Sequence, residues 1–148
     1  MSWQDLERGA PELAAFGVER FRRFDVAYLA TIRADGSPRV HPVTPIVGPG
    51  RLFLFMEPTS PKGHDLRRDP RYALHGAVSS SSGESGEFFV AGQAAFRDDL
   101  ATRQLAASLA SYAPADRYVL FELSVERASS TVYMDGQPIR RRWKAEAE

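Results

Sequence analysis

The sequence lacks cysteine and carries no net charge. None of its 148 residues is a cysteine, which excludes disulfides, thiolate nucleophiles and metal sites held by cysteine. Its nineteen basic residues balance nineteen acidic ones. A protein that binds nucleic acid or a charged membrane surface would show a basic excess, so we expect neither partner.

Long apolar runs are also missing. No segment provides the roughly 20 apolar residues that a membrane-spanning helix needs. The N-terminal segment carries Asp5, Glu7 and Arg8 and no apolar stretch, so it does not resemble a signal peptide. We therefore expect a cytoplasmic protein. The length and ordinary hydrophobic content of 43% favour one domain over residues 1–148, with a core over about residues 12–143.

Several catalytic and metal-binding patterns are absent as well. The sequence has no glycine-rich nucleotide loop, and its three histidines, His41, His64 and His75, fit no metal-binding spacing. We therefore expect no metal site. His75 lies among apolar strand residues and is expected to be hydrogen-bonded in a core or an interface, whereas His64 is expected to face solvent.

What the sequence does contain is a series of short strands. About seven strands and two long helices, Pro11–Phe24 and Asp98–Tyr112, are predicted, and a polar helical turn precedes them at Ser2–Arg8. In the second helix, Leu100, Leu105 and Leu109 are expected to face inward. Tight hairpins are predicted at Asp35-Gly36 and at Asp135-Gly136. These connections predict a mainly β fold, an antiparallel barrel with peripheral helices.

The stretch from Arg51 to Pro70 predicts a buried strand followed by a short helix. The strand is Arg51–Glu57, and the helix is expected to begin at Ser60-Pro61, because serine caps helices and proline is tolerated in the first turn. The helix should end near Asp69, since the residue before a proline is disfavoured in the helical conformation.

Lys62 falls in the first turn of this helix, where the helix dipole disfavours a cation. Free backbone N–H groups, the Ser60 hydroxyl and the Lys62 ammonium would together bind an anion, and phosphate is the usual ligand at such a position. The alternative interpretation is that Lys62 is a solvated surface residue.

The predicted strand Pro38–Val47 carries a second polar pattern. Arg39, His41 and Val43 alternate and so share one face of the strand. The strand is expected to pair with its neighbours on both sides, including Arg51–Glu57, which would bring Arg39 and His41 near Lys62. A groove with cations and apolar residues suits an anionic ligand that has a flat aromatic part.

Two prolines and a glycine mark irregular places in these strands. Pro42 and Pro45 predict that the strand Pro38–Val47 lies at a sheet edge or that its hydrogen-bond ladder opens. In the strand Glu87–Arg97, Gly92 predicts a bulge or the close approach of another segment to the backbone.

Three segments together resemble the pyridoxamine 5′-phosphate oxidase-like family, the FMN-binding split barrels. They are ATIRADGSPRVHPV at Ala30–Val43, RLFLFMEPTSPKGHDLRRDPRYAL at Arg51–Leu74 and EFFVAGQAAF at Glu87–Phe96. The S-x-K corner and the L-R-R-D-P-R ending occur in the family's order. The resemblance implies a six-stranded antiparallel split barrel that forms a homodimer, with FMN bound between the subunits.

The resemblance also implies roles for particular residues. The segment from Arg39 to Thr44, with His41 and Val43, would run along the flavin, and Ser60 and Lys62 would hold the phosphate. The remaining implied contacts are Phe55 and Met56 at the ribityl chain or ring, Glu87 at the flavin, and Tyr133 or Trp143 from the partner subunit.

The chain departs from the vitamin-B6 oxidases of this family at two places. Pro61 stands where those enzymes have an arginine, and their Arg-Leu…Arg tail is not matched by Ile139–Trp143. We therefore do not expect pyridoxal phosphate synthesis. The resemblance implies an FMN-dependent oxidoreductase of unknown substrate. The alternatives are a reductase that uses the deazaflavin coenzyme F-420 and a non-catalytic split barrel that binds flavin or haem. His41 is the one candidate for a hydrogen bond to the ring or substrate.

Overall fold

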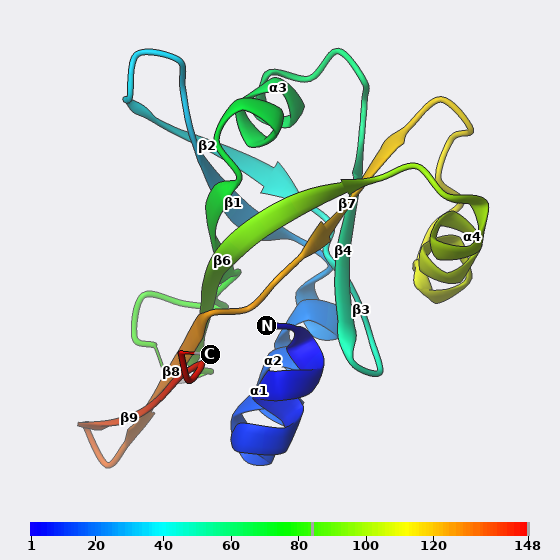
Figure 1. Cartoon of the computed structure of the whole chain (residues 1–148). Coiled ribbons are helices and arrows are strands. Elements are labelled where there is room, and N and C mark those ends of the chain that lie inside the picture. The colour runs from blue at the N-terminus through cyan, green and yellow to red at the C-terminus, as the bar shows by residue number, and fades with distance from the viewer. Residues whose placement is uncertain (84, 148) are drawn as a thin grey trace.

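Nine strands and four helices form the described part of the chain, residues 1–83 and 85–147 of a computed structural model (Figure 1). The helices are α1 (Trp3–Gly9), α2 (Pro11–Phe24), α3 (Pro61–Arg68) and α4 (Leu100–Leu109). The strands are β1 (Ala27–Ile32), β2 (Pro38–Val43), β3 (Ile46–Gly48), β4 (Arg51–Met56), β5 (Arg71–Gly76), β6 (Glu87–Arg97), β7 (Val119–Leu123), β8 (Arg127–Met134) and β9 (Gln137–Lys144).

The strands form one antiparallel sheet that divides at β6 into two wings. The larger wing has the order β2-β1-β5-β6-β8-β9, and the smaller wing has the order β6-β7-β4-β3. Strand β6 pairs with β8 through Glu87–Ala91 and with β7 through Ala94–Arg97. The predicted mainly β barrel with peripheral helices is confirmed, although the described strands number nine instead of the expected six or seven.

The break between β2 and β3 explains part of this difference. The segment predicted as one strand, Pro38–Val47, forms β2 and β3, which are separated at Thr44-Pro45. Proline has no backbone N–H to donate to a neighbouring strand. As predicted, the prolines therefore mark an edge of the sheet and a place where the hydrogen-bond ladder opens. The expected pairing of this segment with Arg51–Glu57 is confirmed for its second part, since β3 pairs with β4, whereas β2 pairs with β1.

Gly92 allows the chain to cross between the wings. A Cβ atom at Gly92 would overlap the backbone carbonyl of Ser124, which joins β7 to β8. The Gln93 N–H donates to Ser124 Oγ at 2.9 Å, and the buried Tyr72 hydroxyl donates to the Ser124 carbonyl at 2.6 Å. The predicted close approach to Gly92 is confirmed.

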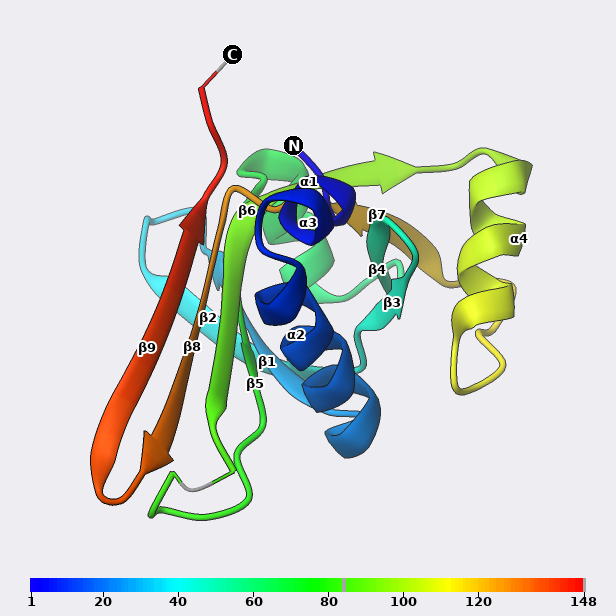
Figure 2. The same cartoon turned by 90° about the horizontal axis from the view of Figure 1, so that it is seen from below.

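Helices α1 and α2 lie between the two wings and fill the concave face of the sheet (Figure 2). The rings of Phe21 and Phe88 meet edge to face at 5.4 Å in the core. Helix α1 contributes Trp3 and Leu6, both fully buried. The expectation of a polar turn at Ser2–Arg8 was therefore incomplete, because α1 has two apolar residues on its inner face.

Helix α4 covers a second, smaller core on the smaller wing. Ala106 is fully buried there, and Leu109 packs against the same cluster. Leu100 and Leu105 are 67% and 38% exposed, so their predicted inward orientation was wrong. The reason is that α4 packs only on the narrow smaller wing, which small residues such as Ala106 are sufficient to contact. None of the helices in residues 1–83 and 85–147 is both long and apolar enough to cross a membrane.

Candidate functional site

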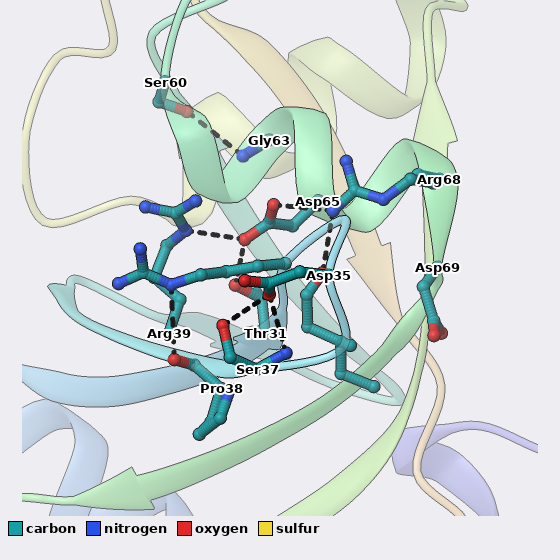
Figure 3. Close-up of polar contacts among 12 residues, drawn as sticks. Thr31, Asp35, Ser37, Pro38, Arg39, Ser60, Gly63, Asp65, Arg68 and Asp69 are labelled. Carbon is teal, nitrogen blue, oxygen red and sulfur yellow. Dashed lines mark hydrogen bonds and ion pairs between the residues drawn. The ribbon is translucent and has the colours of Figure 1, made fainter.

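Local sequence signals set the limits of α3, the helix of the candidate site. Ser60 is its N-cap, and Ser60 Oγ accepts a hydrogen bond from the Gly63 N–H at 3.3 Å (Figure 3). Pro61 occupies the first helical position, and Asp69, just before Pro70, has an extended conformation. The predicted start and end of the helix are confirmed.

The first turn of α3 lies tightly against the end of β4. A Cβ atom at Gly63 would lie 3.1 Å from Met56 Sδ and 3.0 Å from Ser60 Oγ. Leu66, 2% exposed, anchors the other side of the helix in the core. The position of the Lys62 backbone is therefore fixed by packing on both sides.

Lys62 is a half-buried cation at the positive end of this helix. Burial lowers the pKa of its ammonium group. Across the described residues, Lys62 takes part in no ion pair and no side-chain hydrogen bond. A desolvated cation at the positive end of a helix favours an anionic ligand.

A buried carboxylate on α3, that of Asp65, joins three elements (Figure 3). Asp65 is 2% exposed. Its Oδ2 accepts hydrogen bonds from Thr31 Oγ1 of β1 and from Arg39 Nε of β2, both at 2.7 Å, and its Oδ1 accepts one from Arg68 Nη2 at 2.9 Å. Burial alone would raise the pKa of Asp65, but these hydrogen bonds outweigh burial and lower it.

This network holds Arg39 beside α3. The Nε of Arg39 donates to Asp65, and the terminal Nη groups of Arg39 therefore remain available to another acceptor. The sequence predicted that Arg39 would lie near Lys62, but it did not identify Asp65 or Thr31. The sequence feature that could have indicated this network is Thr31, a polar residue on the inward face of β1, where Ala27 and Leu29 are apolar.

The alternation along β2 agrees with the predicted shared face. Arg39 lies opposite Thr31, His41 opposite Leu29 and Val43 opposite Ala27, and directly opposite residues project to the same side. Arg39, His41 and Val43 are half-buried, whereas Val40 is 62% exposed on the outer face. Thr44 follows β2 in the break before β3.

Phe55 and Met56 end β4 with both side chains buried, at 8% and 3% exposure. The Phe55 ring lies 5.2 Å from the guanidinium carbon of Arg103 in the smaller core. Met56 belongs to the main core and contacts the start of α3. A ligand beside α3 would therefore contact mainly the backbone of these two residues, at the end of β4.

Glu87, Tyr133 and Trp143 lie elsewhere in the protomer. Glu87 begins β6, three strands from β2, a separation of roughly 14 Å across the sheet. Trp143 is on β9 and lies against Gly9 of α1. One copy of the chain does not bring these residues together with Lys62, so a shared site would need a second copy.

The histidines do not form a metal centre. Within residues 1–83 and 85–147, no group of three or more potential ligand side chains gathers. His64 is exposed on α3, as predicted. His75 is half-buried on β5, and its Nδ1 lies 2.7 Å from the Gly76 carbonyl, which agrees with the predicted hydrogen bond.

A two-winged antiparallel sheet with α3 packed beside a hairpin is the architecture of a split barrel. The family model described as pyridoxamine 5′-phosphate oxidase matches residues 15–132. The chain therefore belongs to the pyridoxamine 5′-phosphate oxidase family. A search of curated proteins finds no match.

Solved structures from three bacteria share the fold. A heme binding protein from Mycobacterium smegmatis is 21% identical with a TM-score of 0.66, covering 85% of this chain and 57% of its own. A NimC/NimA family protein from Clostridium acetobutylicum is 18% identical with a TM-score of 0.66, covering 95% and 94%. PhzG from Burkholderia lata, in complex with tetrahydrophenazine-1-carboxylic acid, is 18% identical with a TM-score of 0.64, covering 90% and 83%. The chain thus spans little more than half of the mycobacterial protein.

Proposed function

We propose that this chain is a cytoplasmic, FMN-dependent oxidoreductase that works as a homodimer on a small-molecule substrate. The observation that carries the proposal is Lys62, a half-buried cation without an anionic partner among the described residues, at the start of α3. Family membership supports it, since flavins are common cofactors of such split barrels.

The residues at α3 fit the phosphate of FMN. Lys62 would supply an ammonium group, Ser60 a hydroxyl, and Arg39 its terminal guanidinium N–H groups, held in place by Asp65. Charge-assisted hydrogen bonds of this kind are the strong ones in anion binding. A bound flavin would supply the redox chemistry, while the chain binds and orients it. His41, on the same face of β2 as Arg39, would donate a hydrogen bond to the ring or to the substrate.

Titration of FMN into the protein, followed by flavin fluorescence, tests this assignment. Lys62→Ala should weaken FMN binding about 10- to 100-fold, the usual effect of removing a charged hydrogen-bond partner. Arg23→Ala is the control, since it removes an exposed cation from α2. Equal affinities in all three proteins would overturn the phosphate assignment. If the deazaflavin coenzyme F-420 binds more tightly than FMN, the cofactor is the deazaflavin and not FMN.

Haem binding is a second candidate, favoured by the mycobacterial heme binding protein and by His75. The hydrogen bond between His75 Nδ1 and the Gly76 carbonyl leaves Nε2 as the nitrogen available to a metal. Haemin should then give an intense Soret band that His75→Ala abolishes. If His41→Ala, His64→Ala and His75→Ala all keep the band, no histidine of this chain is the axial ligand and this candidate fails.

A further inference from the structure

A groove on the inner face of the larger wing lies between α2 and the hairpin formed by β8 and β9. It has a volume of about 250 Å³. Its walls are apolar and come from both sides, with Leu13 and Phe16 on α2 and with Val132 and Ile139 on the hairpin. Val132 lies directly opposite Ile139, so these two side chains project to the same side of the hairpin. The groove is thus an apolar space that two packed elements leave open.

This groove is separate from the candidate site at α3. Strand β8 lies four strand spacings from β2, or roughly 19 Å across the sheet. The volume of about 250 Å³ also falls below the range of roughly 300–1,000 Å³ that is usual for pockets of drug-sized ligands. The groove therefore does not suit a flavin or a haem, and it suits a molecule of one or two rings.

Ser130 supplies a hydroxyl group to the floor of this groove. It is 5% exposed, and it lies directly opposite Phe88, which belongs to the main core. In the part of the chain that the structure describes, the Ser130 side chain takes part in no hydrogen bond. A hydroxyl buried among apolar groups is unfavourable unless a partner satisfies it. A ligand with a hydroxyl or carbonyl group would provide that partner.

Two opposite charges stand at the mouth of the groove. Arg141 Nη1 donates a hydrogen bond to Glu12 Oε2 at 2.7 Å, which joins β9 to α2. Both side chains face solvent, and Arg141 lies directly opposite Ser130, on the groove side of β9. Because the two charges balance, a charged ligand would have to separate the pair before either partner could bind it. The mouth therefore favours a neutral ligand.

We propose that this groove binds a small neutral molecule with one or two rings and a single hydroxyl or carbonyl group. The ring of Phe16, which is half-buried, and the aliphatic side chains of Val132 and Ile139 would contact the ring system of the ligand. Ser130 would form a hydrogen bond with its polar group. The proposal goes beyond the flavin site and does not require a bound flavin.

Titration of 2-naphthol into protein with isotope-labelled methionine methyl groups, followed by NMR, tests the proposal. Met134 lines the groove, whereas Met56 contacts the start of α3. Because an aromatic ring shifts the resonances of nearby methyl groups, we expect a saturable shift of the Met134 signal and an unchanged Met56 signal. A Met134 signal that does not move, whatever the Met56 signal does, would overturn the proposal.

The preference for a neutral ligand has its own test. The anion 2-naphthoate should bind about tenfold more weakly than 2-naphthol, since its carboxylate would be desolvated beside Glu12. Glu12→Gln leaves Arg141 without its partner, so this variant should bind 2-naphthoate several-fold more tightly and 2-naphthol as before. Binding of 2-naphthoate by wild type that equals or exceeds the binding of 2-naphthol, followed at the Met134 signal, would contradict the proposal.

Matched variants locate the polar contact. Ser130→Ala should weaken 2-naphthol binding about three- to tenfold, the usual effect of one neutral hydrogen bond. Its resistance to urea should not fall, because the variant removes an unpaired hydroxyl. Ser129→Ala is the control, since the neighbouring residue projects to the other face of β8 and its loss should leave binding unchanged. Equal weakening in Ser129→Ala and Ser130→Ala would argue against a contact at Ser130.

Ile139→Asp tests the apolar wall. Ile139 is 44% exposed, so the variant should fold, which circular dichroism checks. A charge in the wall should abolish 2-naphthol binding, because the ligand would have to desolvate the carboxylate. Affinity for 2-naphthol that is unchanged in Ile139→Asp would place the ligand outside the groove and overturn the proposal.

Discussion

Asp65 is the residue on which the local structure of the candidate site depends. It is buried, and it accepts hydrogen bonds from Thr31, Arg39 and Arg68, which lie on three different elements. No short-range signal distinguishes it from the exposed acidic residues, because its partners Thr31 and Arg39 are 34 and 26 residues away in sequence. The sequence could place Lys62 and Ser60 from helix chemistry alone, but it could not reveal the carboxylate that orients Arg39.

Asp65→Asn should lower the free energy of unfolding by about 2 kcal/mol at pH 7, because it removes charged hydrogen bonds in a buried position. The pKa of Asp65 is lowered in the folded state, so its contribution is present above the unfolded value of about 3.9 and is lost as pH falls through the folded value. Urea denaturation at pH 7 and pH 3 measures both effects. The variant should lose less stability than wild type over this range, whereas Asp98→Asn, at an exposed position, should behave as wild type. An unchanged acid dependence in Asp65→Asn would contradict this role.

Lys62 should make FMN binding depend on alkaline pH. Burial lowers the pKa of its ammonium group, so the charged form that binds phosphate is lost as pH rises through that lowered value. FMN affinity measured from pH 7 to pH 10 should therefore decline for wild type. Lys62→Arg, which stays charged over this range, should hold its affinity. Parallel profiles for the two proteins would argue against contact between Lys62 and the phosphate.

At the scale of elements, the sequence correctly predicted the features that neighbouring residues determine, namely helix limits and hairpin turns. The Ser60-Pro61 start and the Pro70 stop gave α3 its limits, and the Asp-Gly pairs gave the hairpins. Pairing between strands that are distant in sequence could not be predicted from such local signals. Strand β4 pairs with β7, and the paired residues Phe53 and Glu122 are 69 residues apart along the chain. Nothing near Arg51 indicates this partner. The orientation of α4 was missed for the same reason, since the wing it covers is assembled from distant strands.

Gly92 carries a prediction about the junction of the two wings. Gly92→Ala should destabilise the protein by about 1–3 kcal/mol, since its Cβ would overlap the rigid backbone carbonyl of Ser124. Gly76→Ala is the matched control: it is also in a strand, but its Cβ would lie 3.7 Å from the nearest atom, which is ordinary contact. Chemical denaturation of both variants measures the difference. Equal stabilities would show that the wings tolerate movement at Gly92.

At the scale of the whole molecule, the larger wing presents an open outer face and an edge at β2. Val40 of β2 and Tyr28 of β1 are 62% and 49% exposed on this face, and Arg39 and His41 lie on the other face of β2. A second copy packed here would bury these apolar side chains and could bring the partner's β8 and β9 toward the flavin site. This is the geometry that the proposed homodimer requires.

Val40→Glu should therefore shift the protein from dimer to monomer at micromolar concentration, because it places a charge within the proposed contact. Leu100→Glu is the control, since Leu100 is 67% exposed but lies on α4, on the smaller wing. Light scattering coupled to size-exclusion chromatography measures the mass of each. A monomeric wild type, or a Val40→Glu variant that stays dimeric, would contradict this interface.

The visible absorption spectrum of the protein, after incubation with FMN and removal of free cofactor by gel filtration, tests the central claim most directly. We expect the two flavin bands to remain with the protein at one FMN per chain, with quenched fluorescence. A protein fraction that retains no flavin bands after the column would contradict the account of Lys62 and α3 as a flavin phosphate site.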